Sequence, residues 1–237
     1  MPTVPSDGVA VLDGPEGHHA ATVRRLGPGA ELVIADGRGT AAACVVSSVE
    51  GKDTVTLRVD RRWHEPEPAP RIVLAQALVK GDRGELAVEL ATETGVDHVL
   101  PWRAARSVAR WDDGPRGAKA LARWRSTARE AAKQSRRSWI PDVGEPVSTT
   151  ALAQVIRDSA AALLLDTGGT PLADLTLPSE GDLVLIVGPE GGFTDHETET
   201  FVSAGAQVAR LGPTVLRAST AAAAAISALG VLTPRWR

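Results

Sequence analysis

A glycine-rich loop directly after an apolar run is the part of this sequence best able to shape a ligand site. Leu183 to Val187 are five consecutive apolar residues, which predict a strand buried on both faces of a parallel sheet. Gly188-Pro189-Glu190-Gly191-Gly192 follows, and its glycines permit backbone angles and close approaches that a Cβ forbids. Thr194 and Glu197 form a capping-box pattern, which predicts a helix over 195–204. This order of strand, loop and helix favours a pocket at the carboxyl end of the strand.

The spacing of these glycines excludes two common phosphate-binding signatures. The loop is neither the G-x-G-x-x-G of dinucleotide-binding proteins nor the G-x-x-x-x-G-K-[ST] of P-loop proteins. A glycine-rich turn between a strand and a helix also occurs where nothing binds. On its own, therefore, the loop leaves ligand binding and plain turn geometry as equal alternatives.

Two further loops strengthen the case for a pocket. Asp166-Thr167-Gly168-Gly169 follows a predicted strand over 162–165, and the segment 211–218 follows another over 208–211. Ligands of parallel sheets bind at the carboxyl ends of the strands, where such loops meet. We expect the three loops to form three walls of one pocket.

The elements that would position these loops fall into two regions. Residues 1–65 contain short apolar runs at 9–12, 31–35, 41–49 and 54–59, with a hairpin turn at Asp36-Gly37-Arg38-Gly39 and one helix from Glu16 to about Leu26, which predict a small barrel-like β domain. Glu65 to Pro70 has alternate prolines and is expected to be a stiff linker. Residues 71–237 then alternate strands and helices, which predicts an α/β domain with a mostly parallel sheet. Its expected elements are strands at 72–77, 99–100, 162–165, 183–187 and 208–211 and helices at 83–94, 115–136, 195–204 and 219–229.

Composition narrows the setting of the protein. Cys44 is the only cysteine, so no disulfide can form within the chain and thiolate metal sites are excluded. His18 and His19 are adjacent and have no suitably spaced partner, so we expect no bound metal. The sequence shows no basic and apolar leader and no run of eighteen apolar residues, and we expect a cytoplasmic protein.

A local excess of positive charge points to a polyanionic partner. The chain carries a net charge of −3, yet residues 103–137 contain eleven basic and three acidic side chains, a net charge of +8. Most charge runs are merely solvated faces, but this asymmetry favours contact with RNA phosphates. On the predicted helix over 115–136, Leu121, Trp124, Ala128 and Ala131 suit the buried side. The candidate RNA-binding residues are Arg24, Arg25, Arg38, Arg103, Arg106, Lys119, Arg123, Arg129, Lys133, Arg136 and Arg137.

Several sequence blocks, in order and spacing, carry a resemblance to a known family. They are Glu93-Thr94-Gly95-Val96, Arg106-Ser107-Val108, Ala131-Ala132-Lys133-Gln134-Ser135-Arg136-Arg137, Gly188-Pro189-Glu190-Gly191-Gly192-Phe193 and Leu211-Gly212-Pro213-Thr214-Val215-Leu216-Arg217. With them the chain closely resembles the RsmE family of bacterial 16S rRNA methyltransferases, within the trefoil-knotted SPOUT superfamily.

The resemblance implies a fold, a cofactor and a substrate. The fold would be a PUA-like β-barrel over 1–65 and a knotted α/β methyltransferase domain over 71–237, acting as a homodimer. The methyl donor would be S-adenosylmethionine, and the acceptor N3 of uridine 1498 of 16S rRNA in the small ribosomal subunit. The glycines at 188, 191 and 192 would then allow crossing backbones and a ligand to share little space. The expected cofactor-binding residues are Leu165, Asp166, Thr167, Gly168, Val187, Gly188, Pro189, Glu190, Gly191, Gly192, Leu211, Gly212, Val215, Leu216, Arg217 and Ala218.

The chemistry of uracil N3 methylation selects candidates for catalysis. N3 carries a proton, so a base or a cation that stabilises the uracil anion should help. Arg217 is the candidate cation, and pairing with a helix is the alternative for it. Glu190 could contact the cofactor or hold its loop through backbone hydrogen bonds, and Glu93 is expected to be structural. Many family members have Glu where this chain has Ser219, so no carboxylate role is transferred there.

Two other functions remain open at this stage. One is a related knotted methyltransferase that acts on tRNA or on a ribose 2′-hydroxyl. The other is a non-catalytic RNA-binding assembly factor that keeps the fold.

Overall fold

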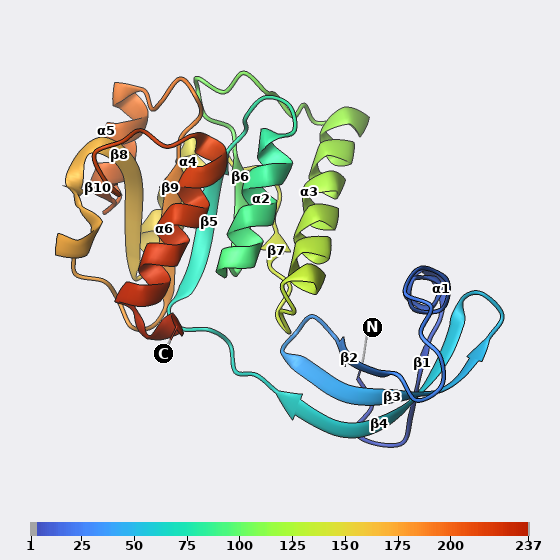
Figure 1. Cartoon of the computed structure of the whole chain (residues 1–237). Helices are drawn as coiled ribbons and strands as arrows, with labels where there is room; N and C mark the ends of the chain where they lie inside the picture. The colour runs from blue at the N-terminus through green and yellow to red at the C-terminus, as the bar shows by residue number, and fades with distance from the viewer. Residues whose placement is uncertain (1–3, 237) are drawn as a thin grey trace. The chain divides into compact units, whose positions relative to one another are not determined.

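The chain divides into two units in a computed structural model that describes residues 4–236. One unit contains the residues up to Glu67 together with Arg137–Trp139 (Figure 1). The other contains Pro68–Arg136 and the residues from Ile140 onward.

The N-terminal unit is a four-stranded antiparallel sheet. Its strands are β1 (Val9–Leu12), β2 (Glu31–Ala35), β3 (Thr40–Glu50) and β4 (Thr54–His64), in the order β1-β4-β3-β2. In the described residues β1 and β2 do not pair with each other, so the sheet is open there. Helix α1 (Gly14–His18) continues into a π-helical turn, η1 (His19–Val23), so the helical segment begins and ends earlier than the predicted Glu16 to Leu26.

The predicted hairpin turn between β2 and β3 is confirmed. One carboxylate oxygen of Asp36 accepts hydrogen bonds from the backbone N–H of Arg38 at 2.7 Å and of Thr40 at 3.0 Å. Burial raises the pKa of Asp36, but these hydrogen bonds outweigh it and the pKa lies below its ordinary value. The turn therefore has a side-chain cap of its own.

The segment 137–139 packs on this unit, although it follows a helix of the other one. The Trp139 indole N–H donates to the Glu65 carbonyl at 3.0 Å, and Gly39 N–H donates to the Ser138 carbonyl at 3.1 Å. A Cβ at Gly39 would lie 2.6 Å from the Trp139 ring, and Gly39 has φ +87°. Only glycine suits this position.

The larger unit is built on a six-stranded parallel sheet, as the uninterrupted apolar runs predicted. Its strands are β5 (Arg71–Ala77), β6 (His98–Trp102), β7 (Asp142–Val143), β8 (Ala161–Pro171), β9 (Asp182–Val187) and β10 (Gln207–Arg210). They lie in the order β10-β8-β9-β5-β6-β7, and every neighbouring pair is parallel. The predicted α/β class is confirmed.

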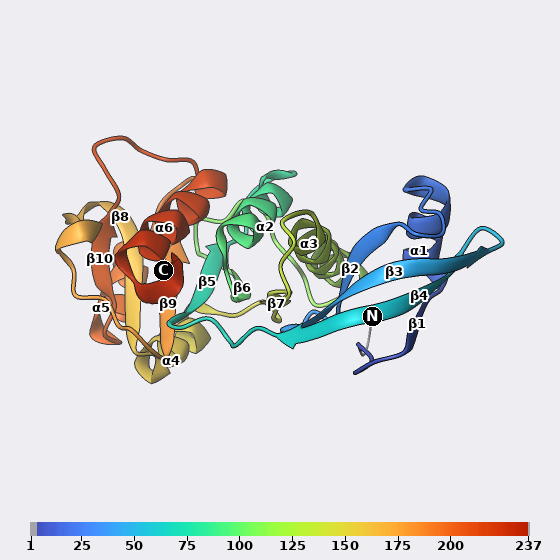
Figure 2. The same ribbon diagram turned by 60° about the horizontal axis from the view of Figure 1, so that its bottom comes forward.

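Helices cover both faces of this sheet. Helices α2 (Arg83–Thr94), α3 (Pro115–Gln134) and α6 (Ala218–Leu232) lie on one face, and α4 (Thr149–Asp158) and α5 (Asp195–Ser203) lie on the other (Figures 1 and 2). Two short 3₁₀ turns, η2 (Leu172–Asp174) and η3 (Pro234–Trp236), complete the unit. The side chains expected on the buried side of α3 are all buried: Leu121, Trp124, Ala128 and Ala131. Two apolar cores result, one on each face of the sheet.

Strand β8 differs most from the prediction. It was expected to end at Leu165 and instead continues to Pro171. Leu164 pairs with Val208, and the next pair is Thr170 with Ala209, so residues 165–169 bulge out between two paired stretches. The expected loop is therefore a wide bulge within a strand. None of the helices in residues 4–236 is long and apolar enough to span a membrane.

Candidate functional site

The three predicted loops lie on neighbouring strands at one edge of the sheet. Strand β8 lies between β10 and β9, so the bulge at 165–169, the glycine loop at 188–192 and the loop at 211–217 are adjacent in the sheet order. The glycine loop and the loop at 211–217 follow the carboxyl ends of β9 and β10, and the bulge begins where the pairing of β8 with β9 ends at Leu164. The sheet thus brings together the segments from which the cofactor-binding residues were predicted, and the role of each residue stays a prediction.

The glycine loop is shaped by a turn and by an aromatic stack. Gly192 N–H donates to the Pro189 carbonyl at 2.9 Å, and Gly192 has φ +68°. The Phe193 ring stacks on Trp102, with ring centroids 5.7 Å apart. A Cβ at Gly188 would lie 2.9 Å from the Phe193 ring. Phe193 therefore anchors the end of the loop and requires glycine at 188.

Protein backbone does not crowd the glycines of this loop, so the part of the interpretation that rests on crossing backbones is wrong, and close approach of a ligand stays a prediction. The atoms nearest a Cβ at Gly188 and Gly191 are the side chains of Phe193 and Arg106, and none lies within 4 Å at Gly192. The close backbone approach occurs instead at Gly169, where a Cβ would lie 2.6 Å from backbone atoms of Val208 and Ala209. Gly169 was absent from the predicted set, although the Gly168-Gly169 pair is the signal that could have found it.

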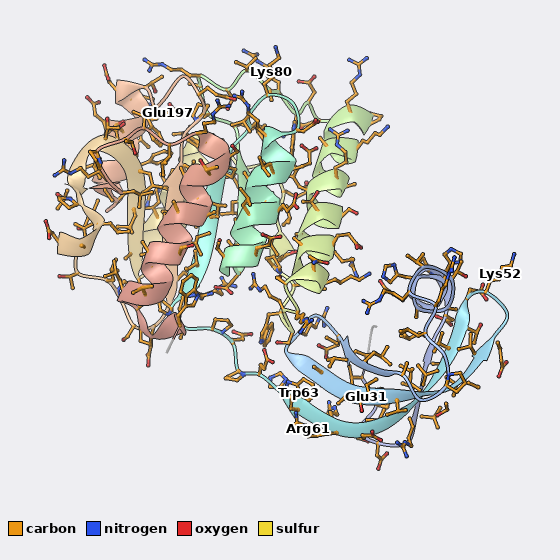
Figure 3. The ribbon with its side chains drawn as sticks, in the orientation of Figure 1. Glu31, Lys52, Arg61, Trp63, Lys80 and Glu197 are labelled. Atoms are coloured by element: carbon orange, nitrogen blue, oxygen red, sulfur yellow. The ribbon has the colours of Figure 1, made fainter. Side chains whose placement is uncertain are left out.

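The capping box at the start of α5 is confirmed. The Thr194 hydroxyl accepts from Glu197 N–H at 3.2 Å, and a Glu197 carboxylate oxygen accepts from Thr194 N–H at 2.8 Å. Glu197 is almost fully buried at 2 % exposure. It lies at the same edge of the sheet as Lys80 (Figure 3).

The two other acidic candidates have different surroundings. Glu190 lies 3.6 Å from Arg83 in a partly exposed ion pair, and it accepts no backbone hydrogen bond within the described residues. Of the two roles expected for Glu190, holding its loop through backbone hydrogen bonds is therefore wrong, and contact with the cofactor stays a prediction. Glu93 is exposed in the last turn of α2, which leads into the amino-terminal end of β6. Glu93 therefore lies at the amino-terminal ends of the strands, whereas the glycine loop lies at the carboxyl ends. This position fits the structural role expected for Glu93.

The loop at 211–217 presents exposed groups. Arg217 is the N-cap of α6, and its carbonyl accepts from Ala221 N–H at 2.9 Å. Its exposed guanidinium has no hydrogen bond or ion pair to any described residue. Val215 and Leu216 beside it are 82 % and 39 % exposed. The buried Ser219 follows within the first turn of the helix.

Comparisons with known proteins place this architecture in a family. A family model described as an RNA methyltransferase domain matches residues 65–230, and one described as an RNA methyltransferase PUA domain matches residues 12–60. The chain is 51% identical over 240 residues to the ribosomal RNA small subunit methyltransferase E of Mycobacterium tuberculosis, covering 99% of this chain and 91% of that protein. The chain belongs to the ribosomal RNA small subunit methyltransferase E family. The family expected from the sequence motifs is confirmed.

Two further members of the methyltransferase E family extend the match. The Bacillus subtilis protein is 32% identical over 235 residues, covering 95% of this chain and 91% of that one. The structure of the Neisseria gonorrhoeae protein, solved with bound S-adenosyl methionine, has a TM-score of 0.85 at 28% identity and covers 98% of this chain and 96% of that chain. Both domains of this chain are included in these matches.

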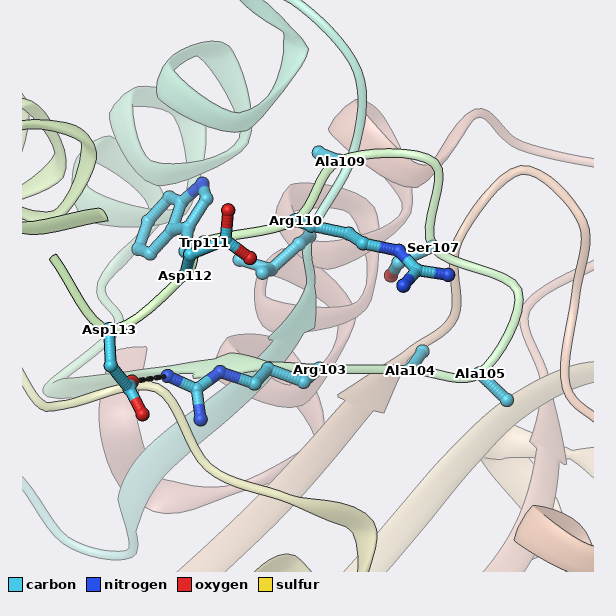
Figure 4. A pocket seen from close by; sticks show the side chains of 10 residues that line it. Arg103, Ala104, Ala105, Ser107, Ala109, Arg110, Trp111, Asp112 and Asp113 are labelled. Atoms are coloured by element: carbon cyan, nitrogen blue, oxygen red, sulfur yellow. Dashed lines mark hydrogen bonds and ion pairs between the residues drawn. The ribbon is translucent and has the colours of Figure 1, made fainter. Parts of the chain in front are cut away.

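A cavity lies at the loop that follows β6 (Figure 4). It has a volume of about 440 Å³ and is lined by the loop that follows β6, residues 103–113. Arg103 and Asp113 form an ion pair at 2.8 Å on its wall. Arg110 also lines it, with no hydrogen bond or ion pair among the described residues. Its two arginines and two aspartates balance in charge, which does not favour a phosphate.

The basic side chains of α3 are exposed but partly paired. Lys119, Arg123, Arg129 and Lys133 of α3 are exposed, as is Arg136 just beyond its end. Arg123 forms an ion pair with Glu85 at 2.9 Å, and Lys133 lies 3.7 Å from Glu130. Their role in RNA binding stays a prediction, as does that of Arg103 and Arg137.

The N-terminal unit offers a basic strand that the sequence interpretation missed. Arg24, Arg25 and Arg38 are exposed, as an RNA surface requires. Beyond Val59, where the strand was expected to end, β4 continues with exposed Arg61 and Arg62. The Arg61 guanidinium lies 5.1 Å from the Trp63 ring (Figure 3). The alternating apolar pattern ends at Val59, which is why a solvent-facing extension of the strand gave no signal.

Within residues 4–236 no group of three or more His, Cys, Asp or Glu side chains could hold a metal ion.

Proposed function

We propose that this chain transfers a methyl group from S-adenosylmethionine to N3 of uridine 1498 in 16S rRNA. The observation that carries the proposal is that the bulge of β8 and the loops after β9 and β10 lie on neighbouring strands, in a chain 51% identical to a ribosomal RNA small subunit methyltransferase E. The Neisseria gonorrhoeae relative binds S-adenosyl methionine, which supports the same cofactor here.

The residues of the three loops fit such a cofactor. The half-buried Leu211 offers apolar surface for an adenine ring, and the backbone of 188–192 offers N–H and C=O groups for its polar edge. A Cβ at Gly212 would meet no atom within 4 Å, so this part of the wall is open. When bound, the cofactor supplies a methyl carbon activated by a positive sulfur. A trefoil knot through these loops is part of the proposal and rests on the family resemblance.

Arg217 is the proposed catalytic residue. Methyl transfer is an in-line displacement, so uracil N3 must approach the methyl carbon from the side opposite the sulfur. Negative charge develops on uracil as N3 loses its proton, and the exposed Arg217 guanidinium at the pocket wall can stabilise it. N3 lies on the Watson–Crick edge, so the target base must be unpaired or flipped into the pocket.

The proposed partner is 16S rRNA within the small ribosomal subunit, which also sets a cytoplasmic location. The exposed cations of α3 and of β4 supply contacts to phosphates. Positive charge concentrated on one helix of a chain with net charge −3 is the pattern of a polyanion-binding surface.

We further propose a homodimer. Helix α6 has no charged residue over its fifteen positions, and Val231 on it is 64 % exposed. Val215 and Leu216, in the loop that leads into this helix, are exposed as well, so a second copy that covers them would lie next to the cofactor. Light scattering at micromolar concentration should give the dimer mass of about twice 24.7 kDa, and a monomer would contradict the proposal.

Two measurements separate this function from the alternatives. Calorimetry should show binding of S-adenosylmethionine, and its absence would leave a non-catalytic assembly factor as the better account. Nucleoside analysis of 16S rRNA from a strain that lacks the gene should show loss of 3-methyluridine. Its persistence, with a loss of a tRNA or ribose methylation instead, would select the related-methyltransferase alternative.

A further inference from the structure

We propose that Arg106 and Glu197 are positioning residues that join the loop after β6 to the glycine loop, so that both act as one wall of the cofactor pocket. The inference rests on the proposed function, because the pocket is taken to bind S-adenosylmethionine. It assigns Arg106 a task different from the RNA contact predicted from its charge.

Glu197 ties two loops together from a buried position. Its Oε1 atom accepts from Ala105 N–H at 2.7 Å, in the loop after β6. Its Oε2 atom accepts from Thr194 N–H at 2.8 Å and from the Thr194 hydroxyl at 2.9 Å, at the end of the glycine loop. The carboxylate lies in the first turn of α5, where the helix dipole stabilises a negative charge. Donors from both loops therefore satisfy one buried anion.

Arg106 makes the reciprocal connection. Its Nη1 atom donates to the carbonyl of Gly191 at 3.0 Å and to the carbonyl of Phe193 at 2.9 Å. Its Cβ would lie 3.1 Å from a Cβ at Gly191, so the side chain runs directly against the loop. The guanidinium thus donates to two loop carbonyls. These hydrogen bonds compete with any contact that it could make with a phosphate.

These bonds act where the chain has the most freedom. Three of the five residues from Gly188 to Gly192 are glycine, and only one backbone hydrogen bond, from Gly192 to Pro189, closes the loop on itself. A loop of this composition loses much conformational entropy when a ligand fixes it. Bonds from Arg106 and Glu197 fix it beforehand, so we expect them to act on cofactor affinity.

The first test compares two arginines of the same loop. R106Q removes the bonds to the glycine loop, whereas R110Q removes the same charge from a side chain that has no partner among the described residues. By calorimetry, R106Q should raise the Kd for S-adenosylmethionine about tenfold, in the usual range of coupling between sites, and R110Q less than about twofold. R106K should recover part of the affinity, because its ammonium can still donate to the carbonyls.

The second test uses the isosteric change E197Q. A glutamine has one acceptor oxygen, so it cannot accept from both Ala105 and Thr194 as the carboxylate does. E197Q should raise KM for S-adenosylmethionine about tenfold, while kcat at saturating cofactor changes less than about threefold. E199Q makes the same charge change at an exposed site of the same helix and should leave KM unaltered. If E197Q does not fold, the affinity of R106Q decides whether the inference holds, because Arg106 is exposed and its substitution leaves the buried core intact.

The outcomes distinguish this inference from the proposed function. A wild-type protein that binds no S-adenosylmethionine would overturn the proposed function itself. Wild-type binding with equal affinity in R106Q and R110Q would overturn only the inference. RNA binding of R106Q that is weaker and less dependent on salt, with unchanged cofactor affinity, would overturn it as well and identify Arg106 as a phosphate contact.

Discussion

Arg217 combines three properties at the scale of a single residue. It caps α6, its guanidinium is exposed and has no described partner, and its loop lies next to the glycine loop in the sheet order. The sequence could place Arg217 in this loop because the loop follows an apolar run that predicts a strand. It could not show whether the side chain pairs with a helix, since that depends on the surroundings of α6.

Removing the Arg217 guanidinium should slow methyl transfer. R217A is expected to lower kcat about 10²- to 10³-fold, the loss typical when a group that stabilises an oxyanion is removed. The measurement is the rate of methyl transfer to unmethylated small subunits at saturating cofactor and RNA. R210A, at the exposed end of β10, is the matched control and should keep the wild-type rate. An unchanged kcat in R217A would remove this residue from the mechanism.

Alanine substitutions at Gly168 and Gly169 should have very different effects on the stability of the protein. A Cβ at Gly169 would lie 2.6 Å from the backbone of β10, and strands must shift to admit it, which costs about 1–3 kcal/mol. A Cβ at Gly168 would meet only the Asp166 side chain at 3.5 Å, an ordinary contact. The free energy of unfolding, measured in urea, should therefore be lower for G169A than for the wild type. That of G168A should lie within about 0.5 kcal/mol of the wild type. Equal stability of both variants would show that the bulge is not tightly packed.

At the scale of elements, patterns of burial in the sequence were the reliable guide. Helix α2 was predicted at its observed bounds, since Gly95 supplies the left-handed C-cap with φ +106°. Helix α4 was missed, although Ser148 caps it and Leu152, Ala153 and Ile156 are buried along it. The bulge in β8 could not be predicted, because its shape depends on pairing with β10, a strand about forty residues later in the chain.

The burial of His98 on β6 should make stability depend on pH. Burial lowers the pKa of His98 below its ordinary value of 6.5, although Asp142 raises it in opposition. The unfolded chain then binds a proton at a higher pH than the native state, so stability is complete above about 6.5 and falls as the pH drops toward the lower native pKa.

The variant H98Q should flatten this dependence. Between pH 7.5 and 5.5 the melting temperature of the wild type is expected to fall further than that of H98Q. H196Q, which removes an exposed histidine from α5, should behave like the wild type. A wild-type slope retained in H98Q would show that another group controls the acid transition.

At the scale of the whole molecule, the charge of one segment is opposite in sign to that of the whole chain. The net charge of −3 hides the +8 of residues 103–137, and the exposed cations of α3 carry much of it. Composition alone would have suggested no affinity for RNA. The clustering did, and six of the eleven basic residues of this segment lie on one helix, α3.

Neutralising single cations of α3 should change the salt dependence of RNA binding. K119Q and R129Q are each expected to reduce the slope of log K against log salt by about one, because each phosphate contact releases about one counterion. R157Q on α4 makes the same change on the opposite face of the sheet and should keep the slope. If K119Q and R129Q keep the wild-type slope, as R157Q should, the RNA does not bind on α3.

The central claim is methyl transfer to a single uracil nitrogen. The direct measurement incubates the purified chain with S-adenosylmethionine, labelled in its methyl group, and small subunits from a strain that lacks the gene, then maps the labelled nucleoside in 16S rRNA. The account predicts one methyl group per subunit, recovered as 3-methyluridine at position 1498. Label in another nucleoside or at another position, or no label despite cofactor binding, would contradict it.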